Sequence, residues 1–568
     1  MGMTFDEAVA VLTAPGMPFE IAEQEVLGRP SRVFAQLPPT MRALFDMLRE
    51  RPGDDVYIVH EDERWTNSEI IGNMDSIARM LVDTYGVQPG DRVAIDMRNY
   101  PEWITSFGAV TSIGAIAVSV NAWWTGPEIE FGLVDSGAKV LIADRERIDR
   151  IGPRLVDLGV QAVVVRSEGT LPANCAHLAS LLDPDATMPD RAVSPDDDAT
   201  ILFTSGTTGT PKGAVSTQRA VLSGLFAFAC RNVVESLRWA PDTPPESGSE
   251  AAVPPKACFI LTVPLFHVTG CVPVMLGSVA TGARLVMMHR WDPLRALELI
   301  ERERVTNFIG VPTMSHDLIS HPRFADFDTS SLRNVGGGGA PMAPELVKKI
   351  SGTFTGRATP QLGYGLTETN GYGPGNTGPD YIERPSSTGR VVPIMQVKVV
   401  NPNGESLPTG EVGEICMTGP MLIRGYWNRP EATADTIIDG WLHTGDLGYL
   451  DDEGFVYVVD RIKDMVLRGG ENVYCSEVEA AIFEHPHVNE VAVFGLPHER
   501  LGEEVVCALQ PAPGTTIDTN ELTGFLAERL ATFKIPTQWF VRTEPLPRGA
   551  TGKILKREIR DRVLEGTY

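Results

Sequence analysis

The sequence predicts a large α/β protein, in which doubly wound sheets form a multi-layer N-terminal domain and a small α+β domain follows. Three observations support this. The chain has 568 residues, which is too long for one compact domain. Residues from about 40 to 165, and again from about 198 to 400, alternate helical and strand-like patterns. The last hundred residues change character, and we place the domains at 1–459 and 460–568.

The composition limits the classes of protein to which the chain can belong. The hydrophobic fraction is 43% and the charged fraction is 22%, as in an ordinary globular protein. A formal net charge of −25 would repel nucleic-acid phosphates, so we expect no nucleic-acid partner. The same charge means that a bound polyphosphate must be held locally, by backbone amides, a few cations and a metal ion.

The cysteines and the N-terminus indicate a cytoplasmic protein. Seven cysteines are scattered along the chain without a CxxC pair, which is typical of reduced thiols. The first residues are acidic and lack the basic flank and the long apolar run of a signal peptide. We find no apolar run of membrane-spanning length and expect no transmembrane segment.

Periodic patterns place the elements of the first domain. Apolar residues at helical spacing predict a helix over 68–85, and short apolar runs predict buried strands over 92–97, 114–120 and 139–143. The stretch 239–255 is rich in proline, serine and acidic residues. We expect a solvated surface insertion there, with a regulatory or partner-binding loop as the alternative.

The last hundred residues mix helical and strand-like signals. Ser476 and Asp518 each begin a sequence typical of a capping box, which predicts a helix after each of them. Residues 488–494 and 504–510 are strand-like. This mixture predicts the small α+β unit.

The strongest local signal is the decapeptide TSGTTGTPKG at 204–213. It follows a predicted strand at 199–203 and precedes a predicted helix at 218–234. Its backbone N–H groups and hydroxyls can wrap a polyphosphate. It is not a Walker P-loop, because Pro211 stands where that motif has its second glycine. The phosphate-binding candidates are Thr204, Ser205, Gly206, Thr207, Thr208, Gly209 and Lys212.

Further motifs follow along the chain. Consecutive glycines let a backbone approach a flat ligand closely, and Asp446 suits two ribose hydroxyls. Lys553 can supply a cation where charge develops on phosphate and carboxylate oxygens. The motifs are GGGGAP (336–341), GYGLTE (363–368), TGD (444–446), DRIKDM (460–465), RGGEN (468–472) and PRGATGKILKR (547–557).

Together these motifs resemble the adenylate-forming superfamily, which includes acyl-CoA synthetases, peptide-synthetase adenylation domains and luciferases. The resemblance runs in the same order from roughly residue 40 to 560. It implies that the chain binds ATP, Mg²⁺ and CoA. It also implies that a carboxylate attacks the α-phosphate of ATP, and that a thiol then displaces AMP.

The resemblance also implies a role for each motif residue. Glu368 holds Mg²⁺, Thr367 contacts the α-phosphate and Lys553 is the catalytic lysine. Lys463 lies at the hinge between the domains. The remaining contacts fall to Gly338, Gly339, Ala340 and Pro341 at the adenine and acyl group, Tyr364 and Gly365 at the adenine, Asp446 and Arg461 at the ribose, and Gly469 and Gly470 at the thiol channel.

The acid-binding region is less well defined by the sequence. The segment 264–270 resembles the family segment at the wall of the acyl pocket, and we expect His267 to orient the carboxylate or to gate the pocket. Val268, Met314 and the glycines at 336–339 suggest an apolar, roomy pocket. No cation is evident there to hold a second carboxylate, and no acidic group to hold a substrate amine.

These expectations favour an acyl-CoA ligase that acts on a medium- or long-chain fatty acid. Aryl or arylpropenoic acids are the second choice. An acyl-AMP ligase that serves a carrier protein is another alternative, but only 78 positions separate Glu368 from Asp446, without an added block. Luciferase-type chemistry shares every motif. The oligomeric state is left open, with a homodimer among the candidates.

Overall fold

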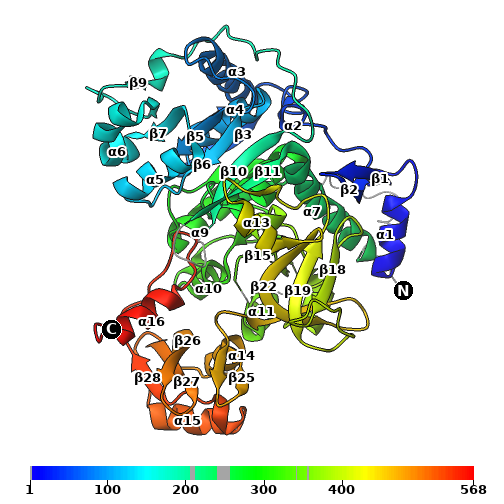
Figure 1. The fold of residues 1–568 in the computed structure, drawn as a ribbon, viewed down its shortest axis with the longest axis vertical. Helices are drawn as coiled ribbons and strands as arrows, with labels where there is room; N and C mark the ends of the chain where they lie inside the picture. The colour runs from blue at the N-terminus through cyan, green and yellow to red at the C-terminus, as the bar shows by residue number, and fades with distance from the viewer. Residues whose placement is uncertain (1–2, 205–210, 240–255, 341, 355–356) are drawn as a thin grey trace.

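The computed structural model describes residues 3–204, 211–239, 256–340, 342–354 and 357–568. Most of the chain forms a large N-terminal domain of mixed α/β structure, and a smaller, β-rich domain lies at its C-terminal end (Figure 1). This is the fold class that the sequence predicts.

The first large sheet is built mainly from residues 92–217. Its inner strands are parallel, and β11 and β20 join antiparallel at one edge. In spatial order the strands are β20 (Gly425–Tyr426), β11 (Lys212–Thr217), β10 (Asp198–Thr204), β6 (Ile116–Ser119), β5 (Arg92–Asp96), β7 (Val140–Asp144), β8 (Gln161–Val165) and β9 (Cys175–His177). The helices connecting its strands are α4 (Pro101–Ser112), α5 (Gly126–Ser136) and α6 (Arg145–Leu158).

The second large sheet is also mainly parallel, with an antiparallel strand at each edge. In spatial order the strands are β17 (Gly375–Thr377), β16 (Thr359–Gly363), β15 (Asn334–Gly338), β14 (Asn307–Gly310), β12 (Cys258–Leu261), β13 (Arg284–Met287), β3 (Val56–His60) and β4 (Glu63–Thr66). The helices of this part are α7 (Gln218–Arg238), α8 (Gly277–Thr281), α9 (Pro293–Glu303), α10 (Pro312–Ser320), α11 (Pro344–Phe354) and α12 (Gly378–Glu383).

One hydrophobic cluster joins the two large sheets. It contains Ile95 of the first sheet, Ile260 of the second and the fully buried Trp103 and Phe107 of α4. Helices α2 (Met41–Asp46) and α3 (Asn67–Asp83) add to it. Helix α3 is the helix predicted over 68–85, and Thr66 begins it with a complete capping box.

Glycines allow the central strands of the second sheet to approach closely. A Cβ atom on Gly337 would lie 1.8 Å from the carbonyl oxygen of Gly310, and one on Gly336 would lie 2.0 Å from that of Gln361. Atoms cannot approach so closely without displacing the backbone. Gly336 and Gly337 are therefore required by the sheet itself, in addition to any ligand.

A third sheet completes the large domain, and a fourth forms the small one. The third contains β18 (Gln396–Val400), β19 (Gly413–Thr418), β21 (Ile437–Ile438), β22 (Trp441–Leu450) and β23 (Val456–Arg461), with α13 (Pro430–Thr436) beside it. The fourth contains β24 (Val466–Arg468), β25 (Glu471–Val473), β26 (Val488–His498), β27 (Gly502–Pro511) and β28 (Gln538–Val541), with α14 (Cys475–Phe483), α15 (Thr519–Ala527) and α16 (Lys556–Leu564).

The two predicted helix caps of the small domain have different outcomes. Asp518 begins α15, and its side chain accepts hydrogen bonds from the backbone N–H groups of Asn520 and Glu521, which is one half of the predicted capping box. Ser476 does not begin α14, because Tyr474 is at the cap position and makes no side-chain cap bond. The Ser476 hydroxyl donates to the backbone oxygen of Val459 instead. The predicted capping box at Ser476 is therefore wrong.

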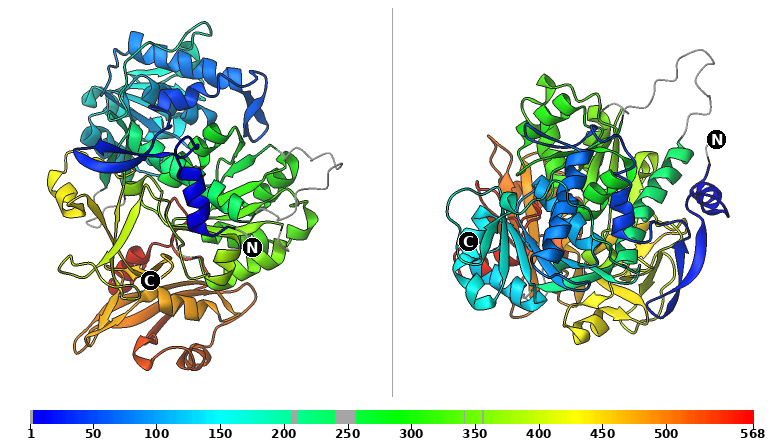
Figure 2. Two further views of the ribbon diagram at one scale, coloured as in Figure 1. Left: turned by 90° about the vertical axis from the view of Figure 1, so that its right-hand side faces the viewer. Right: turned by 90° about the horizontal axis from the view of Figure 1, so that it is seen from above.

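The N-terminal segment packs on the outside of the large domain (Figure 2). Helix α1 (Phe5–Thr13) contacts α7, and a hairpin of β1 (Ile21–Val26) and β2 (Arg29–Phe34) follows it. By length and composition alone α7 could cross a membrane, which the sequence analysis did not anticipate. Half of its most apolar stretch is buried inside the protein, and Ala227, Cys230 and Val234 share a cluster with α1. This packing is that of a core helix.

Candidate active site

The described ends of the decapeptide meet in a hairpin. Thr204 ends β10 and Lys212 begins β11, and the two residues are paired. The Thr204 hydroxyl donates to the backbone oxygen of Lys212 over 3.3 Å. The candidates Ser205, Gly206, Thr207, Thr208 and Gly209, and also Pro341, lie outside the described residues.

Tyr426 connects two of the predicted site residues. Its hydroxyl donates to Oε1 of Glu368 over 2.6 Å, and the ammonium group of Lys212 lies 5.1 Å from the centre of its ring. The geometry of the Lys212–ring contact is that of a cation–π interaction. Strand β20 brings Tyr426 here by pairing with β11, where Tyr426 lies opposite Ala214. Because Tyr426 bonds only one carboxylate oxygen of Glu368, the other oxygen is available to a ligand.

A second group of predicted residues meets around Asp446. The buried Asp446 carboxylate accepts a hydrogen bond of 2.5 Å from the hydroxyl of Tyr364, and its other oxygen lies 3.3 Å from Nε of Arg461. Burial and the negative charge of Asp446 raise the pKa of Tyr364, so the phenol stays protonated and donates. Asp446 and Arg461 are opposite each other on β22 and β23. The predicted adenine and ribose residues are therefore neighbours.

An irregular segment of β22 orients Asp446. The register of the β19–β22 pair shifts just after Glu414, and Gly445 takes a positive φ of 71°. The Glu414 carboxylate accepts a hydrogen bond of 3.0 Å from the Gly445 N–H, and its other oxygen lies 2.7 Å from Nδ1 of His443. The Thr444 hydroxyl accepts from the Asp446 N–H over 3.1 Å. We call residues 443–446 the β22 bulge.

The loop between β28 and α16, which carries Lys553, runs from the small domain toward α10 of the large one (Figure 1). A Cβ atom on the preceding Gly552 would lie 3.3 Å from Cγ2 of Val311, which precedes α10. Burial and the positive charge of Arg461 lower the pKa of Lys553 to about 8, while Asp464 and Asp446 oppose this. The loop is braced by Arg548, which donates to the backbone oxygen of Gly552 over 2.6 Å. Lys553 thus lies within the electrostatic reach of the Asp446 group.

The predicted acid-binding residues lie in largely apolar surroundings. Burial lowers the pKa of His267 to about 4, so this imidazole is neutral at pH 7. Its Nε2 is buried and has no hydrogen-bond partner among the described residues. Val268 and Met314 are buried as well. An unbonded neutral imidazole can bind and orient a substrate oxygen.

The remaining predicted residues of the large domain lie in or next to a short helix and at or just after the end of β15. Thr367 and Glu368 share the short helix η4 (Thr367–Thr369), and a Cβ atom on Gly365 would come within 2.1 Å of the Gly371 oxygen. Gly338 ends β15, and Gly339 and Ala340 follow it.

Two predicted groups lie at or beyond the junction between the domains. Lys463 is exposed in the turn between β23 and β24. Gly469 and Gly470 have positive φ values of 63° and 91° in the turn between β24 and β25. That turn belongs to the small domain, away from β15 (Figure 1), so this arrangement does not bring Gly469 and Gly470 to the other site residues.

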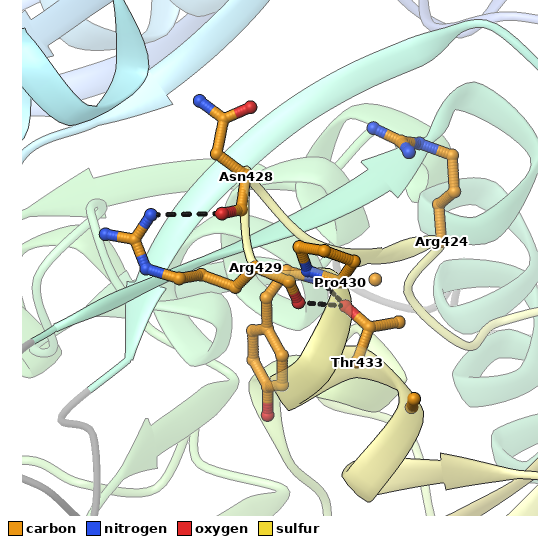
Figure 3. Close-up of a pocket in the computed structure, with 8 residues that line it drawn as sticks. Arg424, Asn428, Arg429, Pro430 and Thr433 are labelled. Carbon is orange, nitrogen blue, oxygen red and sulfur yellow. Dashed lines mark hydrogen bonds between the residues drawn. The ribbon is translucent and has the colours of Figure 1, made fainter.

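A hollow of about 400 Å³ lies beside β20 and α13, and Tyr426 contributes to its lining (Figure 3). Arg424, Asn428, Arg429, Pro430 and Thr433 line it. Its arginines are already paired, Arg424 with Asp198 over 2.8 Å and Arg429 with Asp135 over 2.5 Å. The hollow therefore offers no free cation, and we do not assign it to the reaction.

Sequence reasoning missed Tyr426, Glu414 and His443. Tyr426 lies 58 positions from Glu368, and a single Gly-Tyr pair carries no signal of its own. His443 does precede the TGD motif directly, but only the strand pairing shows that Glu414 lies beside it. These contacts depend on tertiary structure.

Comparison with known proteins decides the family. The family model of AMP-binding enzymes matches residues 45–427, and that of the AMP-binding enzyme C-terminal domain matches residues 477–553. The chain belongs to the AMP-binding enzyme family. Its motifs and relatives place it in the acyl-CoA ligase branch, so this AMP-binding enzyme is an AMP-forming acyl-CoA synthetase, and enzymes of this branch use ATP and CoA.

Relatives of this AMP-binding enzyme differ in the acids named for them. A feruloyl-CoA synthase from Amycolatopsis is 36% identical over 485 residues, which cover 84% of this chain and 90% of that protein. A long-chain-fatty-acid–CoA ligase from Bacillus subtilis is 31% identical over 95% of this chain and 98% of its own length. The crystal structure of ATP-bound MatB from Rhodopseudomonas palustris is 28% identical, with a TM-score of 0.79, and covers 93% of this chain and 100% of its own.

Proposed function

We propose that the protein activates an organic carboxylic acid with ATP to an acyl-adenylate, and then forms the CoA thioester with release of AMP. The observation that supports this best is the meeting of Tyr364, Asp446 and Arg461 beside Lys553. A protonated phenol, a carboxylate and a guanidinium can hold a nucleoside, and the lysine can reach its α-phosphate.

We assign the residues as follows. Lys212, Thr204 and the undescribed part of the decapeptide hold the phosphates, and Thr367 contacts the α-phosphate. The ribose hydroxyls bind to Asp446 and Arg461. Lys553 stabilises the charge that develops as the carboxylate attacks. Catalysis then depends on positioning and charge rather than on a protein nucleophile.

A magnesium ion fits the Glu368 position. One oxygen of this carboxylate accepts from Tyr426, and no described residue bonds to the other. Mg²⁺ commonly takes one or two carboxylates together with phosphate oxygens. When bound, the ion would neutralise part of the charge on the triphosphate. The chain itself contributes by fixing the orientation of Glu368 through Tyr426.

We place the boundary between two moving parts near residue 460, with Lys463 as the pivot. Strand β23 ends at Arg461 and is paired with the third sheet, whereas β24 begins at Val466 in the fourth. Rotation about Lys463 would withdraw Lys553 and bring Gly469 and Gly470 forward to admit the thiol. A cytoplasmic location fits the free cysteines.

The acid remains to be chosen between two classes. Fatty acids and arylpropenoic acids both fit apolar surroundings such as Val268 and Met314. The test of the function is a panel of carboxylic acids incubated with ATP and CoA. We expect AMP release and an acyl-CoA product, identified by mass spectrometry, that require all three substrates. AMP release without CoA consumption would contradict the CoA thioester.

A further inference from the structure

Three glycines lie in register across neighbouring strands of the second sheet. Gly338 of β15 is opposite Gly363 of β16, and Gly363 is opposite Gly375 of β17. Residues that pair directly across strands share a face of the sheet. We call these three residues the glycine strip. It lies at the carboxyl ends of β15 and β16, where open α/β sheets bind their ligands.

The side chain of Arg231 covers one end of the glycine strip. A Cβ atom on Gly375 would lie only 1.6 Å from Nη1 of Arg231, so the guanidinium occupies the space that a side chain would need. The space in front of Gly363 is more open. A Cβ atom there would meet nothing closer than 4.0 Å, and the two atoms at that distance are Nη2 of Arg231 and the oxygen of Gly337.

Arg231 is a cation without a matching carboxylate. It lies on α7 with its guanidinium 5.3 Å from the ring centre of Phe228 and 5.8 Å from that of Tyr372. Its Nη1 donates a hydrogen bond to the backbone oxygen of Gly373 over 3.3 Å. Among the described residues, no carboxylate lies within ion-pair distance of it. Burial lowers its pKa.

Another arginine on the same helix shows the usual arrangement. Arg238 is buried and forms ion pairs of 2.7 Å with both Glu235 and Asp380. Arg231 is partly buried and has no such carboxylate partner among the described residues, so its charge can serve a ligand. A guanidinium has five N–H donors, and Arg231 uses one of them on Gly373. Because Arg231 is only partly buried, its remaining donors are accessible to a ligand.

The other end of the glycine strip lies toward the loop that carries Lys553. Strand β14 neighbours β15, and Val311, which directly follows β14, contacts the loop that carries Lys553. Adjacent strands are about 4.8 Å apart, so β15 and β17 are separated by about 10 Å. An acid that lies across the strip would have its reacting end near Lys553 and its far end near Arg231.

We propose that Arg231 binds a hydrogen-bond-accepting oxygen at the far end of the acid, about 10 Å from the carboxyl group that is activated. This inference rests on the proposed function and narrows its substrate. It favours an arylpropenoic acid with a ring oxygen, or a dicarboxylic acid of similar length, over a simple fatty acid. The sequence analysis found no cation that could hold a second polar group of the acid. Arg231 of α7 is such a cation.

Two matched pairs of acids test this inference. The pairs are 4-coumarate with cinnamate, and sebacate with decanoate, because each pair differs chiefly in the distal oxygen. We expect the unmodified enzyme to show the higher kcat/KM for the oxygen-bearing member of at least one pair. In Arg231→Gln that preference should fall about 10- to 100-fold, as expected for the loss of a charge-assisted hydrogen bond. Arg231→Lys, which keeps the charge, should retain part of it.

The matched control is Arg219→Gln on the same helix. Arg219 pairs with Asp196 at the surface, away from the glycine strip, so its replacement should leave the preference unchanged. Calorimetric ATP binding and thermal melting show that each variant keeps its fold and its nucleotide site. If Arg231→Gln does not fold, the preference for the oxygen-bearing acids, measured in the unmodified enzyme and in Arg231→Lys, still tests the role of Arg231.

The outcomes separate this inference from the proposed function. Preference for 4-coumarate alone identifies a ring oxygen, and preference for sebacate alone identifies a second carboxylate. Equal or better use of cinnamate and decanoate would overturn the role of Arg231 while leaving the ligase function intact. Failure of every acid in a broad panel to yield a CoA thioester would overturn the proposed function itself.

Discussion

Glu368 is the residue on which the metal assignment depends. Its carboxylate offers one oxygen to Tyr426 and leaves the other without a bond to any described residue. Glu368→Gln removes the charge but keeps the shape, so the fold should survive. We expect the rate of ATP–pyrophosphate exchange to fall on the order of 10²–10³-fold. An unchanged exchange rate in a normally folded variant would show that Glu368 holds no magnesium.

Tyr426 permits a finer test of the same group. Tyr426→Phe keeps the ring over Lys212 and removes only the hydroxyl that orients Glu368. We expect kcat/KM for MgATP to fall about 10-fold, the usual effect of one lost hydrogen bond to a charged group. In Tyr426→Leu the fall in kcat/KM for MgATP should be larger, because this variant also removes the ring that contacts Lys212. Equal activity of the Phe variant and the unmodified enzyme would remove Tyr426 from the site.

The pKa of Lys553 predicts a pH dependence. Burial and Arg461 lower this pKa to about 8, so the lysine loses its charge as pH rises through that value. The ratio kcat/KM for ATP reports groups of the free enzyme and should therefore fall above about pH 8. Lys553→Arg stays charged, and its residual activity should not show this fall. A flat profile in the unmodified enzyme more than one pH unit above the pKa would contradict the prediction.

At the scale of elements, the β22 bulge sets the orientation of the Asp446 carboxylate. Glu414 holds the bulge through Gly445 and His443. Glu414→Ala should leave the sheet folded but raise the KM for ATP about 10-fold, with a smaller change in kcat, because Asp446 loses its orientation. Glu414→Gln keeps an acceptor for the Gly445 N–H, so its KM for ATP should lie between that of the unmodified enzyme and that of Glu414→Ala. A reduced kcat with an unchanged KM would indicate a different role for the bulge.

The elements that the sequence predicts well are those with strong local patterns. The strands predicted over 92–97 and 139–143 appear as β5 and β7, within one residue at most boundaries. Asp518 is a true helix cap. Ser476 fails as a cap because the chain entering α14 places its hydroxyl against Val459, a tertiary contact that has no local signal.

At the scale of the whole molecule, the motifs predict the site but not its supports. Tyr364, Asp446 and Arg461 are neighbours, and Lys553 lies within their electrostatic reach, while their roles in the reaction stay predictions. Arg231 could not be found in this way, because its place over Gly375 depends on glycines in three separate strands that only the sheet brings together. Residues that matter through such long-range packing carry no local pattern.

The two domains should divide the reaction between them. Lys553 lies on the C-terminal loop against Val311, which suits adenylation, whereas the turn at Gly469 and Gly470 is turned away. Lys463→Pro fixes φ and removes an N–H at the proposed pivot. We expect it to slow thioester formation more than pyrophosphate exchange. Equal slowing of both half-reactions would speak against Lys463 as the pivot.

The central claim is that one lysine serves adenylation alone and is withdrawn before the thiol attacks. The measurement is thioester formation from CoA and synthetic 4-coumaroyl-AMP or decanoyl-AMP, whichever the unmodified enzyme uses. Lys553→Ala should lose ATP-dependent activity yet convert the supplied acyl-adenylate at close to the normal rate. If the folded variant is as inactive with the acyl-adenylate as with ATP and acid, Lys553 does not act in adenylation alone, and the two-state mechanism is wrong for this protein.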